Sequence, residues 1–133
     1  MFEVSEAART DPDRLAAAFL AELDSIATAN PDSLPVDCQT ALASNDPAAI
    51  TLAQAANILA IDDDRLDDRA IEAELRDRLL IGMSTAVLDV DRLATQIALD
   101  RSPKELQQRI EGRESLSLLE YAHIRSAIAA RTE

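Results

Sequence analysis

Three capping motifs constrain the fold of this chain more than any other feature. Ser102-Pro103-Lys104-Glu105, Ser117-Leu118-Leu119-Glu120 and Thr51-Leu52-Ala53-Gln54 each place a hydroxyl residue three positions before a glutamate or glutamine. In such a capping box, the hydroxyl accepts a hydrogen bond from an otherwise unpaired N–H, and the longer side chain accepts one from the N–H of the cap residue. Each motif therefore predicts the start of a helix.

The composition favours helices over a sheet in the rest of the chain. Aromatic residues make up 2% of the 133 residues, there are two glycines, and 47% of the residues are hydrophobic. The core must therefore be filled by leucine, isoleucine, valine and alanine, which suit closely packed helices. No alternating strand pattern bounded by turn residues is visible. We expect an all-α protein of about seven or eight helices.

Apolar residues at helical spacing indicate where the first helices lie. We expect a helix over residues 11–29, after a loose tail of residues 1–10. A second, short helix is expected over residues 33–45, with Leu42 as its core anchor. The helix that begins at Thr51 has four inward-facing residues: Leu52, Ala55, Ala56 and Leu59.

A long helix is predicted over residues 68–88. Its pairs Glu72–Arg76 and Glu74–Arg78 have the i,i+4 spacing of favourable ion pairs, and we expect both on its outer side. The inward stripe consists of Ile71, Leu75, Leu79, Met83 and Val87. We expect this helix to be the central element that joins the two halves of the chain.

Two segments of the chain are similar to each other. Residues 50–58 lie 66 positions before residues 116–124, and both segments have a capped helix start followed by leucine, alanine and isoleucine at matching positions. This similarity predicts two helix-turn-helix-like units packed about the central helix. The expected organisation is a single compact domain of residues 1–133. It comprises an N-terminal unit of residues 11–61, the central helix 68–88 and a C-terminal unit of residues 89–131.

The negative charge is concentrated in the first two thirds of the chain. The formal net charge is −12, and residues 1–88 contain 17 of the 25 acidic residues but 6 of the 13 basic ones. Residues 89–133 carry a net charge of −1. The last third is therefore where a DNA phosphate backbone would be repelled least. The uneven charge is equally consistent with a second interpretation, in which the acidic loops simply lie in the first two thirds of the chain and no DNA is bound.

Residues 89–130 resemble the helix-turn-helix of Cro/C1-type repressors. The resemblance rests on Leu93-Ala94, Leu106, Ile110-Glu111-Gly112 and Leu116-Ser117-Leu118-Leu119. It implies binding of double-stranded DNA, because arginine, lysine and glutamine on the outer side of the middle helix can reach bases and phosphates. The candidate nucleic-acid-binding residues are Arg101, Lys104, Gln107, Gln108 and Arg113.

An alternative interpretation is a protein-interaction or assembly module with a degenerate helix-turn-helix fold and no DNA contact. Ala98 stands where those repressors have a turn glycine, and Glu105 and Glu111 add negative charge to the middle helix. The equivalent helix of the first half, Pro35 to Ala43, has no basic residue. A module of this kind would bind a protein partner or itself.

The whole chain also resembles an uncharacterised haloarchaeal family of small acidic proteins. Residues 51–61, 79–94 and 102–113 carry this resemblance, and the surplus of aspartate over lysine agrees with it. Such a surface is typical of cytoplasmic proteins in salt-accumulating archaea, where salt screens the self-repulsion. The resemblance implies no particular activity.

No catalytic residues, cofactor-binding residues or metal ligands are expected, and we expect no enzyme and no small-molecule substrate. Cys38 is the only cysteine and is expected to be a small packed residue. His123 is the only histidine, and we expect it on the polar side of the last helix in a surface or half-buried structural role. The aspartate-rich segment 62–68 has Asp67 and Ala73 where a calcium loop needs glycine and glutamate. We see no signal peptide and no apolar run that could span a membrane, so we expect a cytoplasmic protein.

Overall fold

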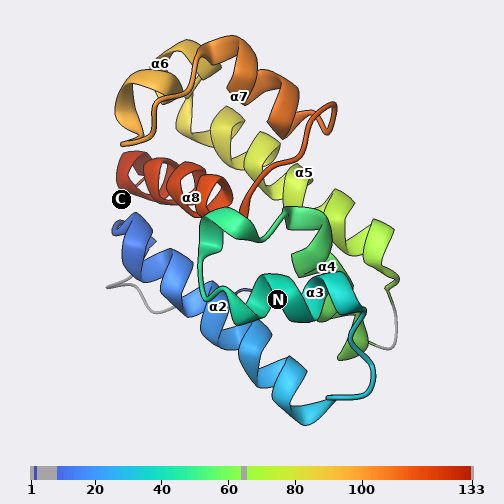
Figure 1. Ribbon diagram of the computed structural model, residues 1–133. Coiled ribbons are helices and arrows are strands. Elements are labelled where there is room, and N and C mark those ends of the chain that lie inside the picture. The colour runs from blue at the N-terminus through green and yellow to red at the C-terminus, as the bar shows by residue number, and fades with distance from the viewer. Residues whose placement is uncertain (1, 3–8, 64–65, 133) are drawn as a thin grey trace.

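The computed structural model describes residues 2, 9–63 and 66–132, and all regular structure in these ranges is helical (Figure 1). The prediction of an all-α fold is therefore confirmed. Most of the predicted tail, residues 1 and 3–8, lies outside the described residues, as does Asp64 of the aspartate-rich segment. The helices are α2 (Pro12–Ala29), α3 (Val36–Ala43), the 3₁₀ turn η1 (Pro47–Ala49), α4 (Leu52–Ile61), α5 (Asp68–Ala86), α6 (Val90–Gln96), α7 (Pro103–Ile110) and α8 (Leu118–Thr132).

The capping motifs begin helices where the sequence predicts them. Ser102 Oγ accepts from the Glu105 N–H at 3.1 Å, and the Ser102 N–H donates to Glu105 Oε1 at 3.2 Å. Thr51 and Gln54 form the same two bonds at the start of α4, both at 3.1 Å. Aspartates supply the other side-chain caps: Asp11 on α2, Asp46 on η1, Asp67 on α5 and Asp89 on α6.

The first half of α8 lies at the centre of the fold, packed against α2, α4, α5 and α6 (Figure 1). Its residues 120–124 are all buried. The Tyr121 ring centroid lies 5.8 Å from that of Phe19 on α2 and 6.2 Å from that of Phe2. Helix α5 packs on α4 and also on α7 and α8, so it contacts helices from both predicted units.

The two similar segments of the sequence meet in a short antiparallel bridge between Thr51 and Ser117. The Leu52 N–H donates to the Leu116 carbonyl at 2.7 Å, and the Leu118 N–H donates to the Ile50 carbonyl at 2.8 Å. The residues before and after the two caps therefore exchange equivalent hydrogen bonds. This exchange connects the starts of α4 and α8 across 66 residues of sequence.

Two predictions on α5 and α3 are wrong. Helix α5 ends at Ala86, and Val87 adopts the left-handed conformation (φ 53°) with 78% of its surface exposed, so it does not extend the inward stripe. On α3, Cys38 and Ala41 occupy the buried positions, and Leu42 is half-buried at their edge.

Two residues are more buried than predicted. Phe2 belongs to the predicted loose tail, yet it is 2% exposed, and its ring lies 4.3 Å from that of Phe19. His123 is 6% exposed rather than on a polar face, because α8 is covered by other helices on several sides.

Candidate functional site

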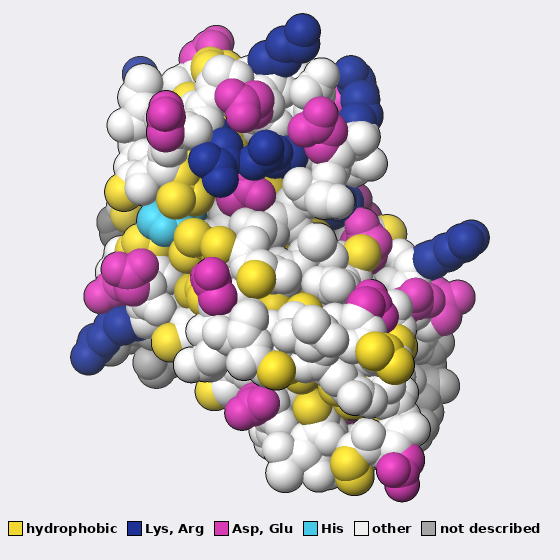
Figure 2. All heavy atoms as spheres, in the orientation of Figure 1, with side chains coloured by type: hydrophobic (Ala, Val, Ile, Leu, Met, Phe, Trp, Pro, Cys, Tyr) yellow, Lys and Arg dark blue, Asp and Glu magenta, His cyan; other side chains and the backbone are white. Residues whose placement is uncertain are grey.

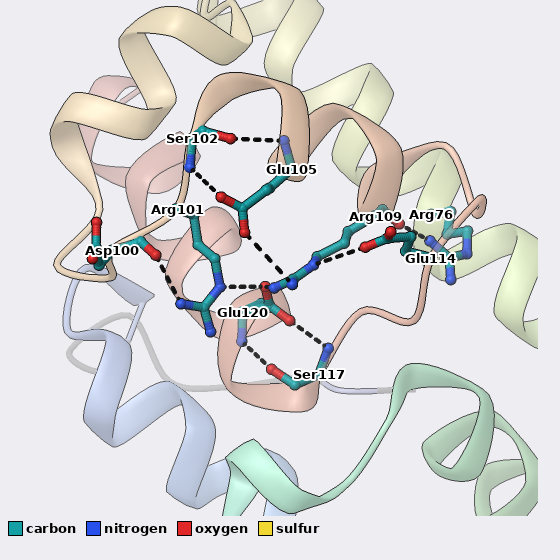
Figure 3. Close-up of polar contacts among 9 residues, drawn as sticks. All are labelled: Arg76, Asp100, Arg101, Ser102, Glu105, Arg109, Glu114, Ser117 and Glu120. Atoms are coloured by element: carbon teal, nitrogen blue, oxygen red, sulfur yellow. Dashed lines mark hydrogen bonds and ion pairs between the residues drawn. The ribbon is translucent and has the colours of Figure 1, made fainter.

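Glu120 is the centre of an ion cluster that joins α7 to α8 (Figure 3). It is 3% exposed, and its Oε2 accepts a hydrogen bond from Arg101 Nε at 3.0 Å and another from Arg109. Its Oε1 accepts from the Ser117 N–H at 2.9 Å, which completes the third capping box. The one carboxylate therefore caps the start of α8 and pairs with two arginines.

Arg109 connects the cluster to further acidic side chains. Its guanidinium lies 3.8 Å from Glu105 Oε2, and its Nε lies 3.8 Å from Glu114 Oε2. Arg76 of α5 forms the predicted pair with Glu72 at 3.0 Å but is directed inward, donating to the Arg109 carbonyl at the end of α7. The cluster therefore joins three helices.

The surroundings of Glu120 lower its pKa below the ordinary 4.5. Burial acts in the opposite direction, but the hydrogen bonds from the Ser117 N–H, Arg109 and Arg101 outweigh it. Because both carboxylate oxygens already accept hydrogen bonds, Glu120 is poorly placed to act as a general base. We interpret the cluster as a structural clamp on α7.

The predicted nucleic-acid-binding residues are only partly available on the surface. Arg101 donates to Glu120, Gln107 donates to Glu111 Oε1 at 3.0 Å, and Arg113 lies 2.6 Å from Glu111 Oε2. Gln108 is half-buried. Lys104 is exposed and forms no ion pair with any described residue.

The charged side chains are unevenly placed on the surface shown in Figure 2. Acidic side chains are spread over this face, whereas most of the basic ones lie in its upper half, over α6 and α7. Arg101 and Arg109 of this region pair with Glu120, and Arg113 pairs with Glu111. Much of the positive charge near α7 is therefore neutralised within the protein.

A second candidate site is an apolar groove between the end of α5, the start of α6 and α7. It has a volume of about 590 Å³. Its apolar lining comes from Leu80, Met83, Val87, Leu88, Val90 and Ile110, and its polar lining from Ser84, Asp89, Gln107 and Glu111. Leu80 and Val87 are 46% and 78% exposed, and the neighbouring Ile81 is 66% exposed. Four large apolar side chains are strongly exposed in the described residues. Two of them, Leu80 and Val87, line this groove, whereas Ile81 lines a separate hollow beside α8 and Val36 lies on α3.

Val87 holds a strained conformation at the edge of this groove. A β-branched residue rarely adopts a positive φ, because its Cβ approaches the following carbonyl. Helices normally place glycine or asparagine at this position. The 78% exposed side chain gains little burial in return. The chain thus keeps an apolar side chain at the groove at a cost in stability.

The remaining reactive groups are buried. Cys38 is a free thiol whose pKa is raised above 9.0 by burial and by Asp37. Burial lowers the pKa of His123 below 6.5, while Asp13 acts in the opposite direction. The described residues contain no group of three or more potential metal ligands, and none of their helices is long and apolar enough to cross a membrane.

The chain matches a family of unknown function, DUF5791, over residues 10–131. The chain belongs to the DUF5791 family. No curated protein and no solved structure gives a significant match. Membership in DUF5791 carries no assigned activity, so the site geometry is the basis for any functional proposal.

Neither site was recognised as such from the sequence. The capping motif identified Glu120 as a helix-start residue, but its arginine partners come from other parts of the chain. At 100° per residue, Arg109 lies roughly 80° around the axis of α7 from the centre of its buried stripe. Helical spacing therefore places it at the border between the buried and the outer face. For the groove, the available signal was the consecutive pair Leu80-Ile81, since a helix with one buried face cannot bury both.

Proposed function

We propose that this DUF5791 chain is a non-enzymatic protein-interaction module that binds a partner in the apolar groove at the end of α5. The observation that supports the proposal is the strong exposure of Leu80 and Val87 in the lining of the groove. Apolar side chains gathered at a concave surface are typical of protein-binding sites. The strain at Val87 agrees with a functional role for its side chain.

A photo-cross-linking amino acid at Ser84 tests the proposal, because Ser84 is exposed and lines the groove. The matched control carries the same amino acid at Val36, which is 77% exposed on α3. We expect a cross-linked partner from position 84 alone, which mass spectrometry identifies and which re-forms the complex from purified components. Leu80→Ser should abolish it. The same products from both positions, or none, would contradict the proposal.

Duplex DNA is the second candidate, and exposed Lys104 supports it. Lys104 lies on the outer side of α7 without an ionic partner among the described residues. It belongs to residues 89–133, the least negatively charged part of the chain. In this case Lys104 would act together with Arg101, Gln107, Gln108 and Arg113.

Fluorescence anisotropy with duplex DNA in high-potassium buffer tests this second candidate. We expect binding that weakens steeply with added salt and is lost in Lys104→Glu. Absence of binding to any duplex would remove DNA from consideration.

A further inference from the structure

We infer that the partner in the groove is a basic amphipathic helix, one with lysine or arginine beside its apolar face. This inference rests on the proposed function and adds the chemistry of the partner. The groove is lined by two charged residues, Asp89 and Glu111, and both are acidic. No lysine or arginine lines it.

The carboxylates occupy the side of the groove formed by α6 and α7, opposite the apolar residues of α5. Asp89 is exposed and caps α6 by accepting from the Arg92 N–H at 2.8 Å. Glu111 is exposed at the end of α7 and pairs with Arg113, which is itself 68% exposed and free to turn away. A bound helix would therefore meet apolar side chains on one edge and negative charge on the other.

The edge of the groove formed by α5 suits a bound helix. Leu80 and Ser84 lie one turn apart on α5, and Val87, directly after the end of α5, lines the same groove, so the three residues form a stripe along its edge. A partner helix with apolar residues at the same spacing can pack along such a stripe, as in helix-in-groove recognition. Below the stripe, Met83, Leu88 and Ile110 form a buried floor.

Charge also argues against the other possible occupants. A second copy of this chain would bring another net charge of −12 toward the acidic edge. An acidic or neutral helix would leave Asp89 without a counter-charge, and Glu111 with Arg113 alone, at a surface that loses water on binding. A basic helix supplies that counter-charge.

The test uses three fluorescent peptides of about 15 residues, or about four helical turns. One is a leucine–lysine amphipathic helix, one has glutamate in place of lysine, and one is a scrambled leucine–lysine peptide. We expect the first to bind, with Leu80→Ser and Val87→Ser each weakening it about 5- to 10-fold through lost apolar contact. Val36→Ser, the matched exposed apolar control, should have no effect.

A second set of variants examines the acidic edge. Asp89→Asn keeps the cap on α6, because asparagine caps as well as aspartate, and removes the charge. Combined with Glu111→Gln, it should weaken the lysine peptide by roughly 3- to 10-fold and reduce its salt dependence. Circular dichroism should show unchanged folding, since all substituted residues are exposed.

The outcomes distinguish the partner chemistry from the groove itself. If the glutamate peptide binds as tightly and Leu80→Ser weakens it, the basic partner is wrong and the groove stands. The same conclusion holds if light scattering shows a dimer that Leu80→Ser dissociates and Val36→Ser does not. If the scrambled peptide binds equally well, or if no peptide responds to the groove variants and the chain stays monomeric, both proposals fail.

Discussion

Replacing Glu120 with alanine tests whether the ion cluster holds α7 onto α8. The side chain is 3% exposed and accepts hydrogen bonds from Arg101, Arg109 and the Ser117 N–H. Loss of the capping bond should cost about 0.5–1 kcal/mol, and loss of the buried Cγ methylene about 0.8 kcal/mol. The arginines would lose their counter-charge.

The cost for the arginines is smaller than for a fully buried pair. Breaking a buried pair costs about 3–5 kcal/mol, but the Arg101 and Arg109 side chains are 31% and 21% exposed and can regain water. We therefore assign about 1.5–2 kcal/mol to this loss, and expect Glu120→Ala to lower the free energy of unfolding by about 3–4 kcal/mol. Glu120→Gln keeps the methylenes and an oxygen for Ser117, so it should cost about half as much.

Urea unfolding followed by far-UV circular dichroism measures both variants. The matched control is Glu74→Gln, which removes an exposed i,i+4 pair with Arg78 at 3.5 Å and should cost less than about 0.5 kcal/mol. Added potassium chloride should remove the effect of the control but leave most of the Glu120 effect, because buried pairs are screened less. If Glu120→Ala costs no more than Glu74→Gln, the cluster does not stabilise the fold.

The pH dependence supplies an independent check on the same group. Because folding lowers the pKa of Glu120 below 4.5, its stabilising effect is complete above that pH and is lost as the pH falls through the lower value of the folded protein. The difference in stability between the wild type and Glu120→Gln should therefore shrink in acid. A difference that stays constant into acid would show that the charge is not responsible.

Three further predictions concern single residues. Val87→Gly should raise the free energy of unfolding by about 0.5–1 kcal/mol. Left-handed backbone costs an L-residue about 1–2 kcal/mol, and part of the gain is offset because glycine loses more conformational entropy on folding. Unchanged or lower stability in urea would contradict this. The single histidine makes an NMR titration unambiguous, and His123 should titrate below 6.5. Its stabilising effect is then complete above 6.5 and lost as the pH falls through the lower value, and a pKa at or above 6.5 would refute the burial argument. Cys38 should react with a thiol reagent far more slowly in the native protein than in urea, and equal rates would show that it is accessible.

The helices could be predicted because their signals are local. A capping box or an aspartate before a proline acts within one helical turn, so Ser102, Thr51 and Asp11 begin helices without help from distant contacts. The C-terminal end of α5 was harder, because Val87 replaces the usual glycine there. Asp89, two residues further on, already caps α6, and this nearby cap requires α5 to end before it.

The candidate sites depend on contacts between helices, which sequence periodicity does not show. Arg101 and Arg109 reach the same carboxylate because α7 lies across the start of α8 (Figure 3). The sequence analysis grouped Arg101 with the outer side of the middle helix, whereas the structure turns it toward Glu120. DNA binding by the outer face of α7 stays a prediction.

The two similar segments, which the bridge between Thr51 and Ser117 joins, differ in electrostatics at one equivalent position. The position three residues after each cap is Gln54 in α4 and Glu120 in α8. Neutral Gln54 completes its capping box and bonds to Asp37 at 3.3 Å, without drawing an arginine inward. Glu120 adds a buried charge at the equivalent place, and Arg101 and Arg109 neutralise it.

The near-zero net charge of residues 89–133 does not mean that all of their basic side chains face the solvent. Arg101 and Arg109 turn inward to Glu120, so the surface near α7 is less positive than a count of its residues implies. At the adjoining groove, the charged lining consists of Asp89 and Glu111. A polyanion would meet reduced attraction on one side of α7 and carboxylates at its end, whereas a basic helix would meet complementary charge beside exposed apolar residues. This difference is the physical reason for preferring a protein partner to DNA.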